Sequence, residues 1–270
     1  MKGEYADLIA LYLDYDYLQE GLDGHRLSLT EVLAGKKLEL YLEDNTKLLI
    51  DFQSSSQLEW RKPNESPKQE KYEAIAVRPD IFFVDWVYHE DPNQSISLVV
   101  DLVAQEATLV WSVLPNPEDA IPNLDARIRK DNDLSAVKVR ITHAGIGGEI
   151  KQKVHHRTQE LVGKRIKYTY GNQHTYEHIY LNESLFTWHC LAGEGKGSAE
   201  TNPVDYLKLG EALYLFIWRE VIAPWVGIIV IDLSQNRTAG KTFWIKPQVN
   251  KIFNLTVGAY AQLLNETKYG

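Results

Sequence analysis

The sequence is poor in sulfur, with one cysteine, Cys190, and one methionine among 270 residues. A single cysteine excludes an intrachain disulfide framework and a zinc site built from several cysteines. It also fits a reducing compartment, so we expect a cytoplasmic protein. Acidic residues interrupt the apolar positions of the first twenty residues, which is unlike the basic start and uncharged core of a signal peptide.

Long apolar runs and positive charge are scarce as well. No apolar run reaches about 18 residues, so the sequence predicts no transmembrane helix. Lys and Arg number 29 against 37 Asp and Glu, which gives a formal net charge of −8. Nucleic acids and anionic membranes attract basic surfaces, so neither is expected as the main partner.

Aromatic residues are abundant, with 15 tyrosines and 7 tryptophans. Such residues favour half-buried strands and small-molecule pockets. Short alternating runs separated by turn residues predict an all-β barrel or sandwich. The clearest of these runs are 37–42, 47–52, 81–87, 95–102 and 107–113.

Two segments depart from the strand pattern. Apolar spacing in residues 5–20 fits a short amphipathic N-terminal helix. Residues 115–135 have no clear periodicity and predict a loop. The glycines of 145–148, followed by His155, mark the best domain boundary. We therefore predict an N-terminal domain over 1–153 and a C-terminal domain over 154–270.

The second half of the chain repeats the first. Three blocks recur in the same order at offsets of 128, 132 and 131 residues: 35–60 with 163–188, 81–86 with 213–218, and 99–102 with 230–233. Blocks that keep their order at nearly one offset indicate duplication. The repeat therefore predicts two tandem antiparallel barrels of about eight strands each.

The two repeats differ at positions that share one strand face. In the first repeat these positions are apolar: Leu38, Leu40, Leu42, Leu48, Ile50 and Phe52. In the second they are mostly polar aromatics: Ile166, Tyr168, Tyr170, Tyr176, His178 and Tyr180, with His174 in phase. Buried hydroxyls and imidazoles need partners. We therefore expect the ligand cavity in the second barrel, with the first mainly a scaffold.

Several segments resemble the molybdenum cofactor biosynthesis protein F (MoaF) family. They are Gly163–Tyr168, Tyr176–Asn182, Phe186–Leu191 and Tyr214–Glu220 in the second half, and Tyr72–Arg78 and Phe82–Trp86 in the first. The similarity covers roughly residues 25–245. It implies a lipocalin-like (calycin) fold for both barrels, and the family name suggests an accessory role in molybdenum cofactor metabolism.

A more distant similarity is to the phenolic acid decarboxylases, which are lipocalin-like lyases without a cofactor. The residues that carry it are Gly163, Tyr168, Tyr170, Tyr176 and Glu177, and further along Tyr214, Trp218 and Glu220. The resemblance implies that Tyr168 and Tyr170 hold a substrate carboxylate and that Glu220 lies near the phenol. The arginine of that family would fall near Gly197, where this chain has Lys196 as the adjacent cation.

The candidate site follows from these patterns. Glu220, Tyr168, Tyr170 and His178 are the predicted catalytic residues, because a buried carboxyl, two phenols and an imidazole suit proton transfer. Predicted substrate-binding residues are His174, Tyr176, Tyr180, Trp188, Lys196, Tyr214 and Trp218. His174 and His178 lie about 13 Å apart at strand spacing, so they cannot share one ion, although one of them could bind an ion together with His189 and Glu220 across strands. We expect neither a metal nor another cofactor.

Three functions remain open. The first is an enzyme that decarboxylates, cyclises or isomerises a phenolic or indolic small molecule in secondary metabolism. The second is a lipocalin that binds a small molecule without chemistry. The third is the molybdenum cofactor role that the family name implies. An aromatic small molecule is the expected partner, and a homodimer stays open.

Overall fold

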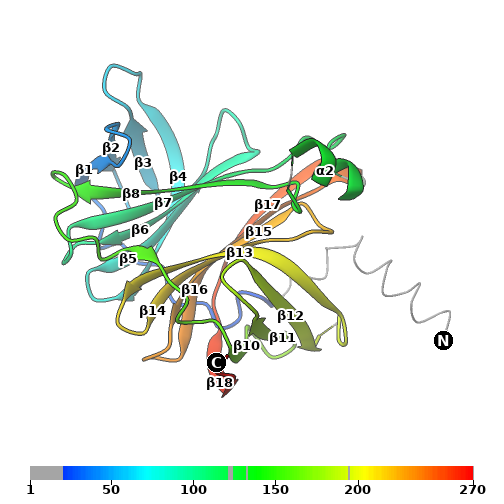
Figure 1. Ribbon diagram of the computed structural model, residues 1–270. Helices are drawn as coiled ribbons and strands as arrows, with labels where there is room; N and C mark the ends of the chain where they lie inside the picture. Colours follow the sequence, from blue (N-terminus) through cyan, green and yellow to red (C-terminus); the bar gives the residue numbers. More distant parts are fainter. Residues whose placement is uncertain (1–20, 121–123, 132, 194, 270) are drawn as a thin grey trace.

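Two closed barrels of eight antiparallel strands lie side by side in the computed structural model (Figure 1). The structure describes residues 21–269 except 121–123, 132 and 194. The architecture confirms the predicted all-β class and the tandem barrels. The predicted helix at 5–20 lies outside the described residues.

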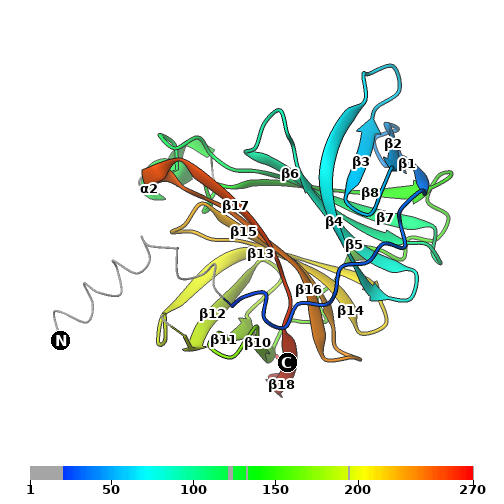
Figure 2. The same cartoon turned by 180° about the vertical axis from the view of Figure 1, so that it is seen from behind.

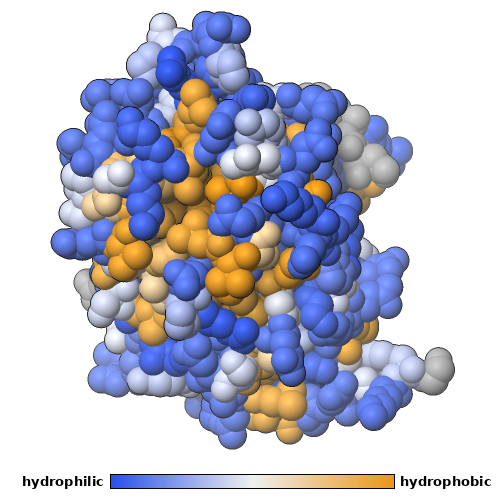
Figure 3. Space-filling view, turned by 90° about the vertical axis from the view of Figure 1, so that its left-hand side faces the viewer, coloured by the Kyte–Doolittle hydropathy of each residue, from blue (hydrophilic) through white to orange (hydrophobic). Residues whose placement is uncertain are grey.

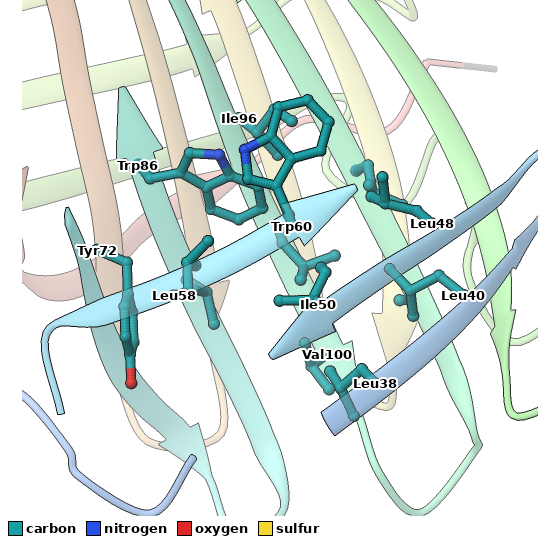
Figure 4. Packing of buried hydrophobic residues seen from close by; sticks show 14 of the residues in the cluster. Leu38, Leu40, Leu48, Ile50, Leu58, Trp60, Tyr72, Trp86, Ile96 and Val100 are labelled. Carbon is teal, nitrogen blue, oxygen red and sulfur yellow. The ribbon is translucent and has the colours of Figure 1, made fainter. Parts of the chain in front are cut away.

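Barrel 1 is formed by eight strands in chain order, and the last closes on the first. They are β1 (Lys37–Leu42), β2 (Lys47–Phe52), β3 (Gln57–Arg61), β4 (Lys68–Arg78), β5 (Ile81–Val87), β6 (Gln94–Asp101), β7 (Glu106–Val113) and β8 (Lys138–Ile146). The predicted inward set lies buried in a single apolar cluster. Figure 4 shows Leu48 of β2 near Trp60, whose ring lies beside that of Trp86.

Barrel 2 repeats this arrangement. Its strands are β10 (Lys164–Thr169), β11 (Thr175–Tyr180), β12 (Leu185–Ala192), β13 (Ala199–Gly210), β14 (Leu213–Arg219), β15 (Trp225–Asp232), β16 (Arg237–Lys246) and β18 (Tyr260–Glu266). Pairing of β10 with β18 and of β12 with β13 closes it. Two further strands extend it: β9 (His156–Arg157) pairs with β13, and β17 (Lys251–Val257) pairs with β16 after the 3-10 turn η2 (Pro247–Val249).

The register explains why the repeat offset changes along the chain. In barrel 1 Trp60 of β3 pairs with Lys68 of β4. In barrel 2 Trp188 of β12 pairs with Glu200 of β13. The second hairpin is therefore longer, and the offset rises from 128 to 132 across it. Thus Trp60 corresponds to Trp188, and Trp86 to Trp218.

The barrels pack against each other through the outer faces of β4–β7 and β13–β16. A second apolar cluster fills this contact and includes Phe83, Val110, Leu215, Ile228 and Phe243. Strands buried on both faces carry few polar residues, as β15 does over Trp225–Ile231. The interface is not wholly apolar, because Lys241 of β16 and Asp85 of β5 form a fully buried ion pair within it.

Residues 21–36, the strap segment, run across both barrels before β1 (Figure 2). His25 donates its backbone N–H to the Tyr170 carbonyl of barrel 2 at 2.8 Å. Thr30 donates its backbone N–H to the Ala74 carbonyl of barrel 1 at 2.8 Å. The strap therefore ties the two barrels together.

The predicted loop at 115–135 is wrong in part, because it contains the helix α2 (Leu124–Asp131). The helix is short and mostly polar, so it lacks the periodic apolar face that would predict it. It contacts barrel 2 through Arg127, which donates to the Val221 carbonyl at 2.6 Å. Packing against the second barrel, rather than local pattern, accounts for its presence.

The described residues include no helix that is long and apolar enough to span a membrane. The face in Figure 3 carries hydrophilic residues around its edge and an apolar area towards its centre.

Candidate functional site

The predicted aromatic residues of the second repeat do face the interior of barrel 2. Tyr168, Tyr170 and Tyr180 are buried in one cluster with Phe186 and Phe216. Tyr176 and Trp188 pack against this cluster and keep part of their surface accessible. The interior is therefore lined by aromatic rings, as the alternation of the sequence predicts.

The deep part of this interior is filled by ring contacts. Tyr168 and Tyr180 share a hydrogen bond of 2.7 Å between their hydroxyls, and both side chains are fully buried. The His178 ring lies between them and the distal residues, 4.6 Å from the Tyr168 centroid and 5.9 Å from that of Trp218. Burial among these rings lowers the pKa of His178 to about 3, so its imidazole is neutral at neutral pH.

The distal end of barrel 2 is the end that carries the loops 171–174, 193–198 and 220–224. Glu220 lies there, directly after β14, in phase with Trp218. Its backbone N–H donates to the Trp225 carbonyl at 2.9 Å, which fixes it at the start of the β14–β15 turn. Its side chain keeps part of its surface accessible. It is nevertheless crowded enough by protein that its pKa lies well above the ordinary value.

A second carboxyl, missed in the sequence analysis, lies at this end. Glu200 of β13 is 8% exposed and accepts the backbone N–H of Ile222 at 2.8 Å. The Asn202 side chain, fully buried, accepts the Val221 N–H at 2.9 Å and donates to Glu200 at 3.3 Å. These bonds hold the β14–β15 turn, and with it Glu220, against β13.

The surroundings of the two carboxyls shift the pKa of Glu220 further than that of Glu200. Desolvation raises the pKa of both, and it is the largest cause for each. For Glu200, backbone N–H groups, Asn202 and the Arg127 guanidinium act in the opposite direction. For Glu220, the Glu200 charge adds to the increase, and only the nearby Trp218 opposes it. Glu220 is therefore the carboxyl whose protonated form is favoured more strongly.

The other predicted binding residues are distributed over both ends of barrel 2. The Tyr214 hydroxyl donates to Glu160 at 2.8 Å, outside the distal group. His174 is buried at the distal end, where its ring lies close to Gly21 of the strap and Gly193. Lys196 lies on the β12–β13 hairpin with its side chain exposed. Cys190 is buried beside Tyr176, and burial raises the pKa of its thiol.

The Trp218 ring lies directly over Gly227 of the neighbouring strand. A Cβ at Gly227 would come within 2.0 Å of this ring. We expect Gly227→Ala to displace the indole and destabilise the fold by about 1–3 kcal/mol, the usual range for overpacking. Urea unfolding followed by tryptophan fluorescence measures this. Gly148→Ala, where a Cβ meets nothing within 4 Å, is the control. An equal, small effect of both changes would contradict the contact.

Stability should fall on acidification because His178 is buried as a neutral ring. Its pKa is about 3 in the folded chain against 6.5 as the ordinary value. The unfolded chain binds the extra proton in this window, so this contribution is complete above pH 6.5 and is lost towards pH 3. His178→Phe should make the loss shallower by up to ~1.4 kcal/mol per pH unit. His156→Gln, at an exposed histidine, should leave the slope unchanged in the same urea titrations.

The fold and this aromatic interior define a tandem barrel protein with two carboxyls of raised pKa, Glu200 and Glu220, at the distal end of its second barrel. The sequence profile of the MoaF C-terminal domain matches residues 155–267, and that of the MoaF N-terminal domain matches residues 10–116. Protein MoaF of Klebsiella aerogenes is 34% identical over 263 residues, which covers 96% of this chain and 98% of that protein. The chain belongs to the MoaF family.

Among solved structures, a candidate beta-lactamase from Burkholderia vietnamiensis matches 40% of this chain and all of its own. The TM-score is 0.33 and the identity is 14%. A likeness at that level carries no argument about the function of this chain.

Proposed function

We propose that the second barrel is a catalytic site that acts on a phenolic or indolic small molecule by acid–base chemistry, without a cofactor. The observation that carries this proposal is the partly accessible Glu220 beside Trp218 and the buried Glu200, with the pKa of both carboxyls raised by desolvation. Carboxyls are rarely buried together in a structural role, because desolvation and mutual repulsion both oppose it. Groups with strongly shifted pKa values cluster at functional sites.

Glu220 is the proton donor in this proposal. Burial and the neighbouring Glu200 both raise its pKa well above the ordinary value, so it keeps its proton to higher pH than an ordinary carboxyl. His178 takes no part as an acid, since its low pKa leaves the imidazole neutral. It contributes ring contacts and holds its neighbours in place. Of Glu220 and His178, which the sequence analysis both assigned to proton transfer, the proposal keeps this role for Glu220 alone.

The aromatic residues supply the binding surface. Tyr176 and Trp188 lie edge to face at 6.1 Å between centroids, and both are partly accessible. An electron-rich ring packed against the accessible surface of such side chains gains apolar burial and favourable ring geometry. Tyr170 lies 6.1 Å from Tyr176 and would bind an oxygen of the substrate, whereas the Tyr168 hydroxyl is already bonded to Tyr180.

This arrangement suits a reaction in which a conjugated substrate takes up one proton. In a decarboxylation the carbon that bears the carboxylate first accepts the proton from Glu220, using an electron pair of the conjugated system. The carbon–carboxylate bond then breaks, and its electron pair restores the conjugated system. Carbon dioxide leaves, and water returns a proton to Glu220. Isomerisation and ring closure need the same proton donor.

The test is a set of phenolic and indolic acids and ketones incubated with the purified chain. Binding is followed by quenching of tryptophan fluorescence, and turnover by the absorbance of the conjugated system. Turnover of at least one compound supports the proposal. Tight binding without turnover by any compound assigns the barrel to the non-catalytic binding proteins instead. Co-purified pterin fluorescence would favour the molybdenum cofactor role.

A further inference from the structure

Outside the barrel interiors, three potential metal ligands meet where the chain leaves barrel 1. Glu106 of β7, His143 of β8 and His155 each place a ligand atom within 4.8 Å of the others. All three are buried, with exposures of 1%, 8% and 0%. We infer that these residues form a structural site for a zinc-class divalent ion that fastens the segment between the barrels to barrel 1.

The local fold brings the ligands together from distant positions. Residues 147–155 turn back over the outer face of β7 and β8. The approach is close, because a Cβ at Gly145 would lie 2.2 Å from the Gly148 carbonyl oxygen. The Glu106 carboxylate accepts the backbone N–H groups of Val154 and His155 at 2.8 and 3.1 Å. These bonds bring the His155 ring next to β8.

The hydroxyl of Thr108 lies between the two imidazoles. Its oxygen is 2.9 Å from Nδ1 of His143 and 2.7 Å from Nδ1 of His155. One hydroxyl has one proton, so it can donate to only one of the two rings. The rings and the hydroxyl already lie at spacings close to those between the ligands of one ion. A cation bound here would accept the imidazole lone pair that the single hydroxyl proton leaves without a partner.

The surroundings favour a cation over an empty hydrogen-bonded cluster. Nε2 of His155 is buried and, among the described residues, has no hydrogen-bond partner. A buried polar atom without a partner costs about 1–3 kcal/mol.

The donor set selects the class of ion. Two imidazole nitrogens and one carboxylate oxygen suit Zn²⁺ and its neighbours in the transition series. Mg²⁺ and Ca²⁺ prefer sets made of oxygen alone. The ligands are buried, and they lie on the outside of barrel 1 rather than at the distal end of barrel 2. The site therefore serves to hold the structure and is independent of the proposed catalytic carboxyls.

The experiment measures zinc binding by the intact chain after dialysis against a chelator. Equilibrium dialysis with elemental analysis should show one zinc per chain, and zinc should raise the temperature of thermal unfolding. His143→Gln and Glu106→Gln should each weaken binding by at least about 10-fold, which is what losing even an outer-shell partner can cause. His156→Gln, at the exposed neighbour whose Nδ1 lies 2.8 Å from the Val154 carbonyl oxygen, should bind zinc normally.

Absence of zinc binding by the folded wild-type chain would overturn the inference. So would unchanged binding in folded His143→Gln and Glu106→Gln chains. Should these variants fail to fold, a crystal of the wild-type chain measured at the zinc absorption edge decides the matter. Anomalous density between Glu106, His143 and His155 supports the site, and density elsewhere overturns it.

Discussion

Glu220→Gln should abolish most of the turnover in barrel 2 while leaving ligand binding nearly intact. The amide has the size of the carboxylic acid and fits the same place after β14, but it cannot deliver a proton. General acid catalysis contributes about 10²–10⁴-fold, so a loss of at least about 100-fold in kcat is expected with little change in KM. Steady-state kinetics on a substrate found by the screen measures both.

Glu211→Gln is the matched control, because Glu211 precedes the same strand at its other end and is exposed. It should retain full turnover. A Glu220→Gln chain that binds the substrate and turns it over at the wild-type rate would remove Glu220 from the chemistry. A folded Glu220→Gln chain that no longer binds would instead assign Glu220 to substrate recognition.

The pH dependence has a definite sign. Glu220 donates only in its protonated form, and its pKa lies well above the ordinary value. Turnover should therefore hold through the weakly acidic range and fall as the pH rises through the pKa of Glu220. Glu200→Gln removes the neighbouring charge that contributes to this shift, so the fall should move to lower pH.

Much of the fold was accessible from the sequence because strand alternation is a local pattern. Leu40 and Tyr168, for example, face the interiors of their barrels as their spacing predicts. The repeat indicated two barrels because equivalent strands recur in order. Neither pattern predicts which strand faces form the interface between the barrels. Strands such as β15, which is buried on both faces, identify this interface only once the structure is known.

The distal carboxyl site was only partly accessible. Glu220 follows a recognisable apolar strand, so its position in phase with Trp218 could be inferred. Glu200 and Asn202 precede Pro203, a residue that argues against a central strand, and no strand was predicted there. Arg127 lies on a helix far before Glu200 in the sequence, yet its charge lowers the pKa of that carboxyl. Such long-range contacts follow from packing, and no spacing rule reveals them.

Lys241→Met should be among the most destabilising single changes in the interface. Lys241 is 0% exposed, and its ammonium group lies 2.7 Å from both the Asp85 carboxylate and the Ser95 hydroxyl. Met preserves the length of the side chain but leaves Asp85 buried without its counter-charge. Breaking a buried pair on one side costs about 3–5 kcal/mol. Urea unfolding at neutral pH should show a loss of this size.

The loss in Lys241→Met can come from the missing ion pair or from the unpaired charge that it leaves on Asp85. A double change distinguishes these two causes. When Asp85→Asn is combined with Lys241→Met no charge remains, while the new amide can still bond to Ser97 and Asn254, the present partners of Asp85. The double variant should therefore recover most of the stability that Lys241→Met loses. Lys37→Met breaks a pair with Asp51 of the same 2.7 Å length, but that lysine is 77% exposed. It should change stability far less, because water already solvates both charges. Equal losses for Lys37→Met and Lys241→Met would show that burial of the interface pair is not what makes it sensitive.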